Sequence, residues 1–161
     1  MAYEYDLLTV EIDGCLARVI ISNPPINLMT PDLYNELRNV CIELENDDSL
    51  SGVLFKSANP DFFIAHFDVE AILQFPTDDE PRRETELNPF HQMCERVRTI
   101  DKVTIAQIEG RVGGGGSEFV SSMEMRFGVS GKTVVNQMEV PIGILPGGSG
   151  TQRWPRLMGT G

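Results

Sequence analysis

Apolar and polar residues alternate, or recur at helical spacing, along most of the chain, and these patterns predict its elements. Residues 7–12 and 15–22 are strand-like runs on either side of Asp13-Gly14, a pair typical of a tight hairpin turn. The prolines within residues 23–27 cannot continue a strand, so we expect a loop after the hairpin.

Two segments carry apolar residues on one helical face. The first begins at Thr30, which can cap a helix, with Pro31 in the first turn, and the second begins at Asn88-Pro89. We expect both apolar stripes to pack into the core. The stripes are Leu33, Leu37, Val40, Cys41 and Leu44 in the first helix, and Phe90, Met93, Cys94, Val97 and Ile100 in the second.

The remaining segments complete an α/β pattern. The predicted strands lie at 52–56, 103–108 and 125–129, the predicted helices at 69–75, at 117–123 and from 151 onward, and irregular chain at 136–150. The charged segment 75–87 is predicted to be a mobile loop. This order predicts one α/β domain over residues 1–161, built from repeated β-β-α units.

Charge and composition narrow the possible functions. The 161 residues carry a formal net charge of −11, which argues against binding to nucleic acid or to an anionic membrane. No apolar run approaches membrane-spanning length and the N-terminus shows no secretory signal, so we expect a cytoplasmic protein. Cys15, Cys41 and Cys94 show no metal-ligand spacing and are predicted to be reduced and mostly buried.

Four consecutive glycines, Gly113 to Gly116, lie between the strand at 103–108 and a helix predicted to begin near Ser117. Glycine lets another backbone or a ligand approach closely. A helix that begins here leaves backbone N–H groups unpaired at its N-terminus, where they can bind an anion or a developing oxyanion. Glu118 is expected in the first turn of that helix, beside the same N–H groups.

Two carboxylates are candidates for acid–base chemistry. Glu118 follows the glycines, and Glu139 lies between Met138 and Val140, where it is either partly buried or a surface residue beside a turn. A phosphate-binding loop of the NTPase type is excluded, because no Lys-Ser or Lys-Thr pair follows the glycines. Ser117 lacks the surroundings of a nucleophile elbow and is not expected to act as a nucleophile.

Residues 106–118, 137–139 and 143–153 closely resemble the crotonase (enoyl-CoA hydratase/isomerase) superfamily, and residues 63–68 (Phe-Ile-Ala-His-Phe-Asp) resemble its first oxyanion-hole motif. The resemblance implies a crotonase-like spiral of repeated β-β-α units, and an enzyme of fatty acid metabolism that forms trimer-based homo-oligomers. Members of the family run further than Gly161, with C-terminal helices that help to close the acyl pocket. The resemblance therefore implies an N-terminal core that is truncated at the C-terminus.

The resemblance also assigns roles to residues. It implies an acyl-CoA thioester as the substrate, with coenzyme A as part of that substrate, and neither a separate cofactor nor a metal. The backbone N–H groups of Phe67 and Gly115 would hold the thioester oxygen as it gains enolate charge, and Glu118 and Glu139 would hold the water that adds to a 2-enoyl-CoA. The motifs imply further substrate-binding positions at Ala65, His66, Asp68, Gly114, Pro146 and Gly147.

Several positions depart from the family's pattern. Phe67 is bulky where the family has a small residue, and the neighbouring His66 is read as a loop residue turned away from the site, with an acid–base role as the alternative. The loop at 23–25 lacks the basic residue that contacts CoA phosphates in the family, so Lys56 or Arg18 is a candidate substitute.

Three classes of function stay open at this point. The presence of both Glu118 and Glu139 favours a hydratase, which is a lyase, because isomerases of the family commonly keep one of the two acids. Isomerisation or thioester hydrolysis on the same oxyanion hole is the second reading. The third is a catalytically silent module that binds CoA or a protein partner.

Overall fold

The computed structural model describes residues 3–77, 80 and 85–159. The chain opens with the predicted hairpin, in which β1 (Leu8–Asp13) pairs antiparallel with β2 (Leu16–Ile21). Gly14, in the turn between them, adopts a φ of 59°, a left-handed conformation that glycine adopts readily. The hairpin predicted from Asp13-Gly14 is therefore confirmed.

The hairpin forms one edge of a five-stranded sheet in the order β1-β2-β3-β5-β7. Beyond the hairpin, each neighbouring pair in this sheet is parallel, which requires long crossover connections. Buried and less buried positions alternate along β2 and β3, as expected for a sheet with one face against the core. The strands added to the hairpin are β3 (Gly52–Ser57), β5 (Val103–Ile108) and β7 (Met125–Gly128).

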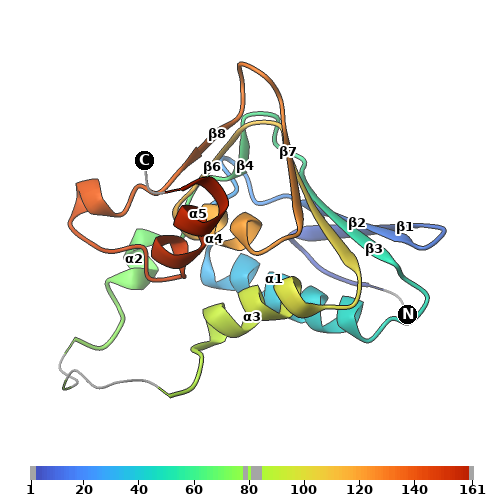
Figure 1. Ribbon diagram of the computed structural model, residues 1–161, viewed down its shortest axis with the longest axis horizontal. Coiled ribbons are helices and arrows are strands. Elements are labelled where there is room, and N and C mark those ends of the chain that lie inside the picture. Colours follow the sequence, from blue (N-terminus) through green and yellow to red (C-terminus); the bar gives the residue numbers. More distant parts are fainter. Residues whose placement is uncertain (1–2, 78–79, 81–84, 160–161) are drawn as a thin grey trace.

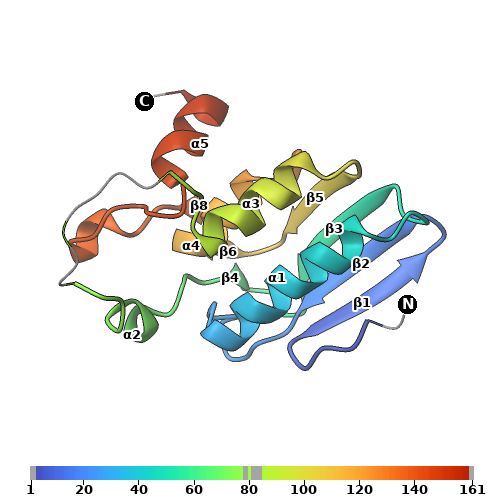
Figure 2. The ribbon, with the colours of Figure 1, turned by 90° about the horizontal axis from the view of Figure 1, so that it is seen from below.

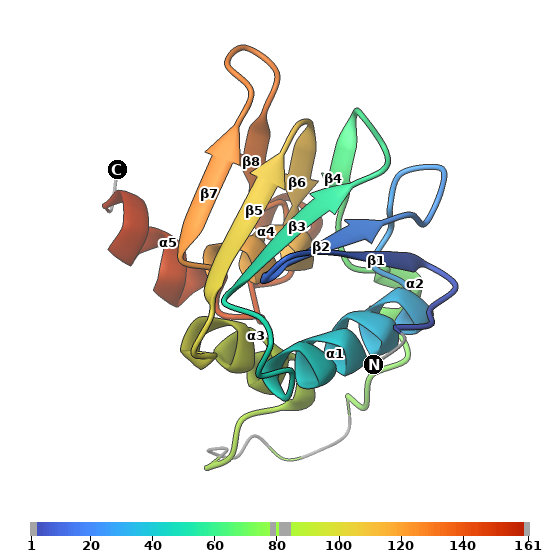
Figure 3. The same cartoon turned by 90° about the vertical axis from the view of Figure 1, so that its right-hand side faces the viewer.

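A second sheet of three parallel strands, in the order β4-β6-β8, lies behind the first in Figure 3. Its strands are β4 (Phe62–Ile64), β6 (Arg111–Gly113) and β8 (Val134–Asn136). The sequence analysis missed this sheet, because a strand of three residues is too short for an alternating pattern to stand out. Since β6 leads directly into the glycine run, this sheet positions the candidate site.

Two longer helices, α1 (Pro31–Glu45) and α3 (Pro89–Thr99), lie on one side of the five-stranded sheet and contact each other (Figures 1 and 2). The predicted cap at Thr30 and the predicted start at Asn88-Pro89 are confirmed: the Thr30 and Asn88 side chains each accept a hydrogen bond from a backbone N–H group in the first turn. The apolar stripes are confirmed as well, with Phe90 and Ile100 half-buried and the other predicted members buried.

Two helices late in the chain frame the glycine run. All residues of α4 (Gly114–Ser121) are buried, and this helix contacts both α5 (Gly150–Met158) and the three-stranded sheet. The prediction of a helix at 117–123 is wrong at both ends. The helix starts earlier because three glycines form its first turn instead of the loop before it, and it ends at Ser121. The last helix begins one residue before the predicted start.

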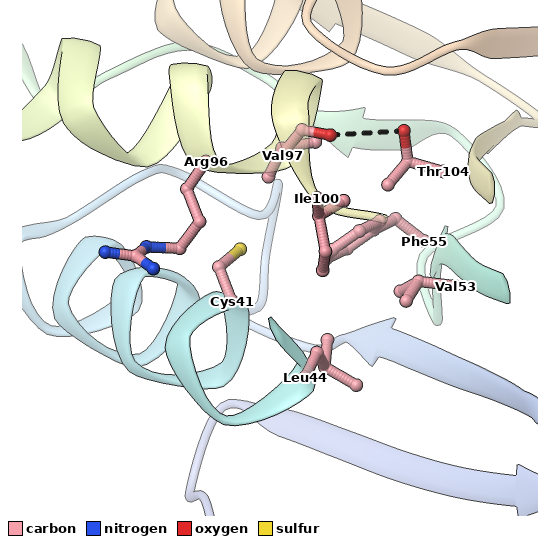
Figure 4. Close-up of a pocket in the computed structure, with 8 residues that line it drawn as sticks. All are labelled: Cys41, Leu44, Val53, Phe55, Arg96, Val97, Ile100 and Thr104. Carbon is pink, nitrogen blue, oxygen red and sulfur yellow. Dashed lines mark hydrogen bonds between the residues drawn. The ribbon is translucent and has the colours of Figure 1, made fainter. Parts of the chain in front are cut away.

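The core lies between the five-stranded sheet and the helices. Near its centre the rings of Phe55 and Phe119 meet edge to face, with their centroids 5.3 Å apart. A cavity of about 10 Å³ lies between α1, α3, β3 and β5. Figure 4 shows its lining side chains, among which the Thr104 hydroxyl donates to the Val97 carbonyl. This cavity has room for about one water, and none of its lining residues is a candidate site residue.

Other expectations differ in detail. The helix predicted at 69–75 is α2 (Val69–Ile72), which is shorter, and the irregular segment 136–150 contains a 3-10 turn, η1 (Val140–Ile142). The mobile loop predicted at 75–87 includes 78–79 and 81–84, which lie outside the described residues.

The three cysteines are free thiols, as predicted, but their burial differs from expectation. Cys41 and Cys94 are buried. Cys15 is exposed, because it lies in the turn of the hairpin, so the expectation of burial is wrong for this residue.

Candidate functional site

The glycine run forms the entry to α4. Gly113 is the N-cap residue, and Gly114, with a φ of 50°, is the first residue of the helix. Glu118 is consequently the fifth residue of α4 and lies in its second turn, so the prediction that it lies in the first turn is wrong. Gly115 is the second residue, and its N–H has no acceptor one turn earlier in the helix.

The segment that follows β4 is held by Met29, which forms a parallel bridge opposite Phe67. Met29 donates to the carbonyl of His66 at 2.9 Å and accepts from the N–H of Asp68 at 3.0 Å. The N–H of Phe67 is not used in this pairing, because in a parallel bridge the opposite residue points its own N–H away. The N–H groups of Phe67 and Gly115 are the two oxyanion donors that the sequence analysis predicts.

Glycine is required where α4 meets the segment after β4. A Cβ on Gly116 would lie 2.7 Å from the Ile64 side chain, and one on Gly115 would lie 3.2 Å from Phe67 Cβ. Such close approach leaves no room for a side chain at Gly116 and little at Gly115. The same contacts bring the two predicted donor residues, Phe67 and Gly115, next to each other.

Glu118 is a buried carboxyl group with 3% of its surface exposed. Its Oε1 accepts a hydrogen bond of 2.8 Å from the N–H of Gly150, the first residue of α5. Burial raises the pKa of Glu118 to about 7. The backbone N–H groups of Gly150 and Gly148 and the charge of Arg153 act in the opposite direction, while the neighbouring Glu139 carboxylate raises the pKa further.

Glu139 is the second buried carboxyl group, 7% exposed, and lies at the start of η1. A Cβ on Gly114 would lie 3.3 Å from Glu139 Oε1, so this carboxylate faces the first residue of α4. Among the described residues, Glu139 Oε2 is buried without a hydrogen-bond partner. Burial raises the pKa of Glu139. Of the two interpretations of Glu139, the surface residue is wrong and the buried carboxylate is confirmed.

A hydrogen-bonded group that the sequence analysis missed connects the elements around the carboxylates. The buried Ser117 hydroxyl accepts from Gln137 Nε2 at 2.8 Å and from Trp154 Nε1 at 3.2 Å. Gln137 Nε2 also donates to the Gly114 carbonyl at 3.1 Å. These bonds connect α4, α5 and the segment that carries Glu139. The sequence shows that these residues can form hydrogen bonds, but which of them pair depends on the tertiary fold.

The predicted substrate-binding residues form two groups, and Asp68 belongs to neither. Ala65, His66 and Gly114 lie together beside the donors, and His66 Nδ1 donates to the Phe67 carbonyl at 2.7 Å, since a carbonyl can only accept. Asp68 instead caps α2, accepting from the Glu70 N–H at 2.9 Å.

Pro146 and Gly147 belong to the second group. They line a pocket of about 320 Å³ together with Glu95 and Arg153, which form an ion pair. The Gly147 carbonyl lies 2.8 Å from His91 Nε2 and accepts its hydrogen bond. The pocket adjoins the site, because Gly147 directly precedes the Gly148–Gly150 segment that contacts Glu118.

The two predicted phosphate contacts lie on neighbouring strands of the large sheet. Arg18 of β2 pairs with Asp13 at 2.8 Å, and Lys56 lies on β3 opposite Ile20. Within the described ranges no group of His, Cys, Asp and Glu side chains is arranged to hold a metal ion. None of the helices in the same ranges combines the length and the apolar character needed to cross a membrane.

Comparison with known proteins identifies a family and a fold. Residues 11–161 match the model of the enoyl-CoA hydratase/isomerase family. A Streptomyces avermitilis protein provisionally assigned as an enoyl-CoA hydratase is 33% identical, with a TM-score of 0.83 over 97% of this chain and 58% of that chain. DspI of Pseudomonas aeruginosa is 27% identical, with a TM-score of 0.81 over 96% of this chain and 62% of that chain. An enoyl-CoA hydratase of Geobacillus kaustophilus is 26% identical, with a TM-score of 0.83 over 97% of this chain and 58% of that chain.

The chain therefore spans about three fifths of the length of these proteins. Within the described residues, the family match begins inside β1 and extends through α5. Since the match covers most of the sequence and one relative of the same fold exceeds 30% identity, the chain belongs to the enoyl-CoA hydratase/isomerase family and has its crotonase-like α/β fold.

Proposed function

We propose that this protein adds water across the double bond of a 2-enoyl-CoA thioester. The observation that carries the proposal is the presence of two buried carboxyl groups at α4, with Glu139 facing its first residue and Glu118 in its second turn. A buried carboxyl group is costly to keep unless it is paired or serves the chemistry of the site. Glu139 Oε2 has no hydrogen-bond partner among the described residues, so its capacity to accept a hydrogen bond is unused within them.

In the proposed reaction, the thioester oxygen accepts hydrogen bonds from the N–H groups of Phe67 and Gly115. These donors stabilise the enolate charge that develops as water adds, and one such donor typically contributes about 3 kcal/mol. Water adds as hydroxide to the β-carbon and loses its proton to one carboxylate, while the α-carbon receives a proton from the other carboxyl group. Glu118 and Glu139 must therefore start in opposite protonation states.

The pKa of Glu118 supports this role. At about 7, it allows the group to exist in either protonation state near neutral pH. A catalytic acid or base works best when its pKa lies near the working pH. The Coulombic effect of Glu139 on this pKa also favours a state in which only one of the two groups is charged.

The substrate, location and assembly of the protein belong to the same proposal. Two of the relatives named above are described as enoyl-CoA hydratases, one of them provisionally, which supports an acyl-CoA substrate. We also propose that the protein acts in the cytoplasm in fatty acid metabolism, and that it assembles from copies of itself. Coenzyme A would enter as part of the substrate, with no further cofactor.

Isomerisation of a 3-enoyl-CoA to the 2-enoyl isomer is a second candidate. The observation in its favour is the unequal state of the two carboxyl groups: Glu118 Oε1 already accepts from Gly150, whereas Glu139 Oε2 has no partner among the described residues. A single free carboxylate can move a proton between two carbons of the substrate without adding water.

A paired assay separates the candidates. Purified protein would be given a short 2-enoyl-CoA and, separately, a short 3-enoyl-CoA. The Glu124→Gln variant serves as a control for the loss of a carboxylate outside the site, because Glu124 is exposed just after α4. The proposal expects hydration of the 2-enoyl thioester by both proteins. Isomerisation without hydration would support the second candidate. Binding of CoA thioesters without turnover would indicate a silent binding module.

A further inference from the structure

Three aromatic side chains, Tyr34 of α1, Phe67 and Phe90 of α3, form an aromatic cluster beside the predicted oxyanion donors. Their ring centroids lie 6.1 to 6.3 Å apart in all three pairings, within the range of favourable aromatic contacts. Each ring is half-buried and packs against the hydrophobic core. Each is therefore held in place by the other two and by the core behind them.

The aromatic cluster reaches the site at two glycines. A Cβ on Gly115 would lie 3.2 Å from Phe67 Cβ and 3.7 Å from Phe90 Cζ. A Cβ on Gly148 would collide with both the edge of the Phe90 ring and Glu118 Oε2. The edge of Phe90 therefore borders both the predicted donor at Gly115 and the carboxylate of Glu118.

We infer that the aromatic cluster restricts this site to short acyl chains, such as crotonyl; the inference rests on the function proposed above. A thioester held by the Gly115 N–H, with its double bond next to Glu118, places its acyl carbons against the rings of Phe67 and Phe90. In an open apolar pocket, each added methylene increases affinity by about fourfold. Here the added methylenes meet rings that are already packed against one another and against the core.

Binding of saturated acyl-CoA thioesters, measured by calorimetry, tests this inference without relying on turnover. An open pocket would bind octanoyl-CoA about 200-fold more tightly than butyryl-CoA, from four added methylenes. We expect the wild-type protein to bind octanoyl-CoA no more tightly than butyryl-CoA. Phe90→Ala should bind octanoyl-CoA at least tenfold more tightly than the wild type does, and butyryl-CoA within about threefold of the wild type.

Two further variants make the test specific. Phe90→Leu keeps an apolar side chain and serves if Phe90→Ala fails to fold, with a smaller shift in the same direction. Phe127→Ala is the control, because Phe127 is exposed on β7 and its removal should leave the chain-length profile unchanged. Wild-type affinity that rises steadily with chain length, or the same profile in Phe90→Ala, would overturn the inference.

The outcomes also distinguish this inference from the proposed function. If butyryl-CoA binds at least as tightly as octanoyl-CoA but no 2-enoyl-CoA is hydrated, the proposed reaction is contradicted and the size restriction is supported. Hydration of long-chain enoyl-CoA by the wild type would support the reaction and overturn the restriction. Failure to bind any acyl-CoA would overturn both.

Discussion

The carboxylate of Glu118 accepts a hydrogen bond of 2.8 Å from the backbone N–H of Gly150. The bond joins the second turn of α4 to the first residue of α5, and the N-terminus of a helix favours a negative charge at this place. The position of the candidate catalytic group therefore depends on the segment that leads into α5. This dependence gives the first prediction.

Gly148→Ala should displace the Glu118 carboxylate. A Cβ at Gly148 would collide with Glu118 Oε2 and with the Phe90 ring. We expect a loss of about 1–3 kcal/mol in the free energy of unfolding, from overpacking, and a loss of hydration activity of at least tenfold. Denaturant unfolding and steady-state kinetics measure the two effects.

The neighbouring glycine provides the matched stability control. A Cβ on Gly147 would meet only Leu145 atoms at 3.9 Å, an ordinary contact. Gly147→Ala should therefore change the free energy of unfolding by about 0.5 kcal/mol or less. Equal effects of the two substitutions would show that the contact with Glu118 is not the cause.

The raised pKa of Glu118 predicts a pH dependence of stability. The folded protein holds this proton up to about pH 7, whereas the unfolded chain releases it near pH 4.5. Between these values the folded state binds more protons, so the stabilising contribution is complete below pH 4.5 and is lost as pH rises toward 7. Each unit of pKa difference between the folded and unfolded states corresponds to about 1.4 kcal/mol, so the free energy of unfolding should fall by roughly 3 kcal/mol across this pH range.

Glu118→Gln should remove this part of the pH dependence, because glutamine does not titrate. The free energy of unfolding of both proteins would be measured at several pH values from about 4 to 8. This range includes the interval between the unfolded pKa of 4.5 and the folded pKa of about 7. We expect the wild-type value to fall more steeply across that window than the value of the variant. Parallel curves would mean that Glu118 titrates normally in the folded protein.

Ser117→Ala should destabilise the arrangement around the carboxylates. It would leave Trp154 Nε1 without its acceptor and would reduce Gln137 Nε2 to one acceptor, the Gly114 carbonyl, at a cost of about 1–3 kcal/mol. Ser121→Ala is the comparison in the same helix, because the Ser121 hydroxyl only donates to the Glu118 carbonyl at 2.7 Å. We expect a smaller loss there, about 1 kcal/mol, by thermal or denaturant unfolding.

Local sequence predicts much of the fold because the relevant signals are local. Asp13-Gly14 predicts the hairpin, and Thr30 and Asn88 predict the starts of α1 and α3, since turns and caps depend on a few neighbouring residues. The three-stranded sheet escapes prediction, because its short strands are defined by pairing partners that are distant in sequence. The start of α4 at Gly114 escapes for a related reason. Glycine has low helix propensity, and only close packing against Ile64 and Phe67 explains its presence there.

The site was predicted unevenly. Glu118, Glu139 and Gly115 could be named as candidates because they lie in motifs that resemble a known family. Whether Glu139 was buried could not be decided from its neighbours, and the structure decides it through the contact with Gly114. The Ser117–Gln137–Trp154 group and the aromatic cluster were not foreseen, because each joins residues from separate elements.

The most direct test of the central claim is hydration of crotonyl-CoA by the wild type, Glu118→Gln and Glu139→Gln, followed by loss of the conjugated-thioester absorbance. The proposal predicts that the wild type hydrates the substrate and that each variant loses roughly 10²–10⁴-fold in turnover while retaining its fold and butyryl-CoA binding. Retained hydration in both folded variants would contradict a mechanism in which the two carboxyl groups carry the protons.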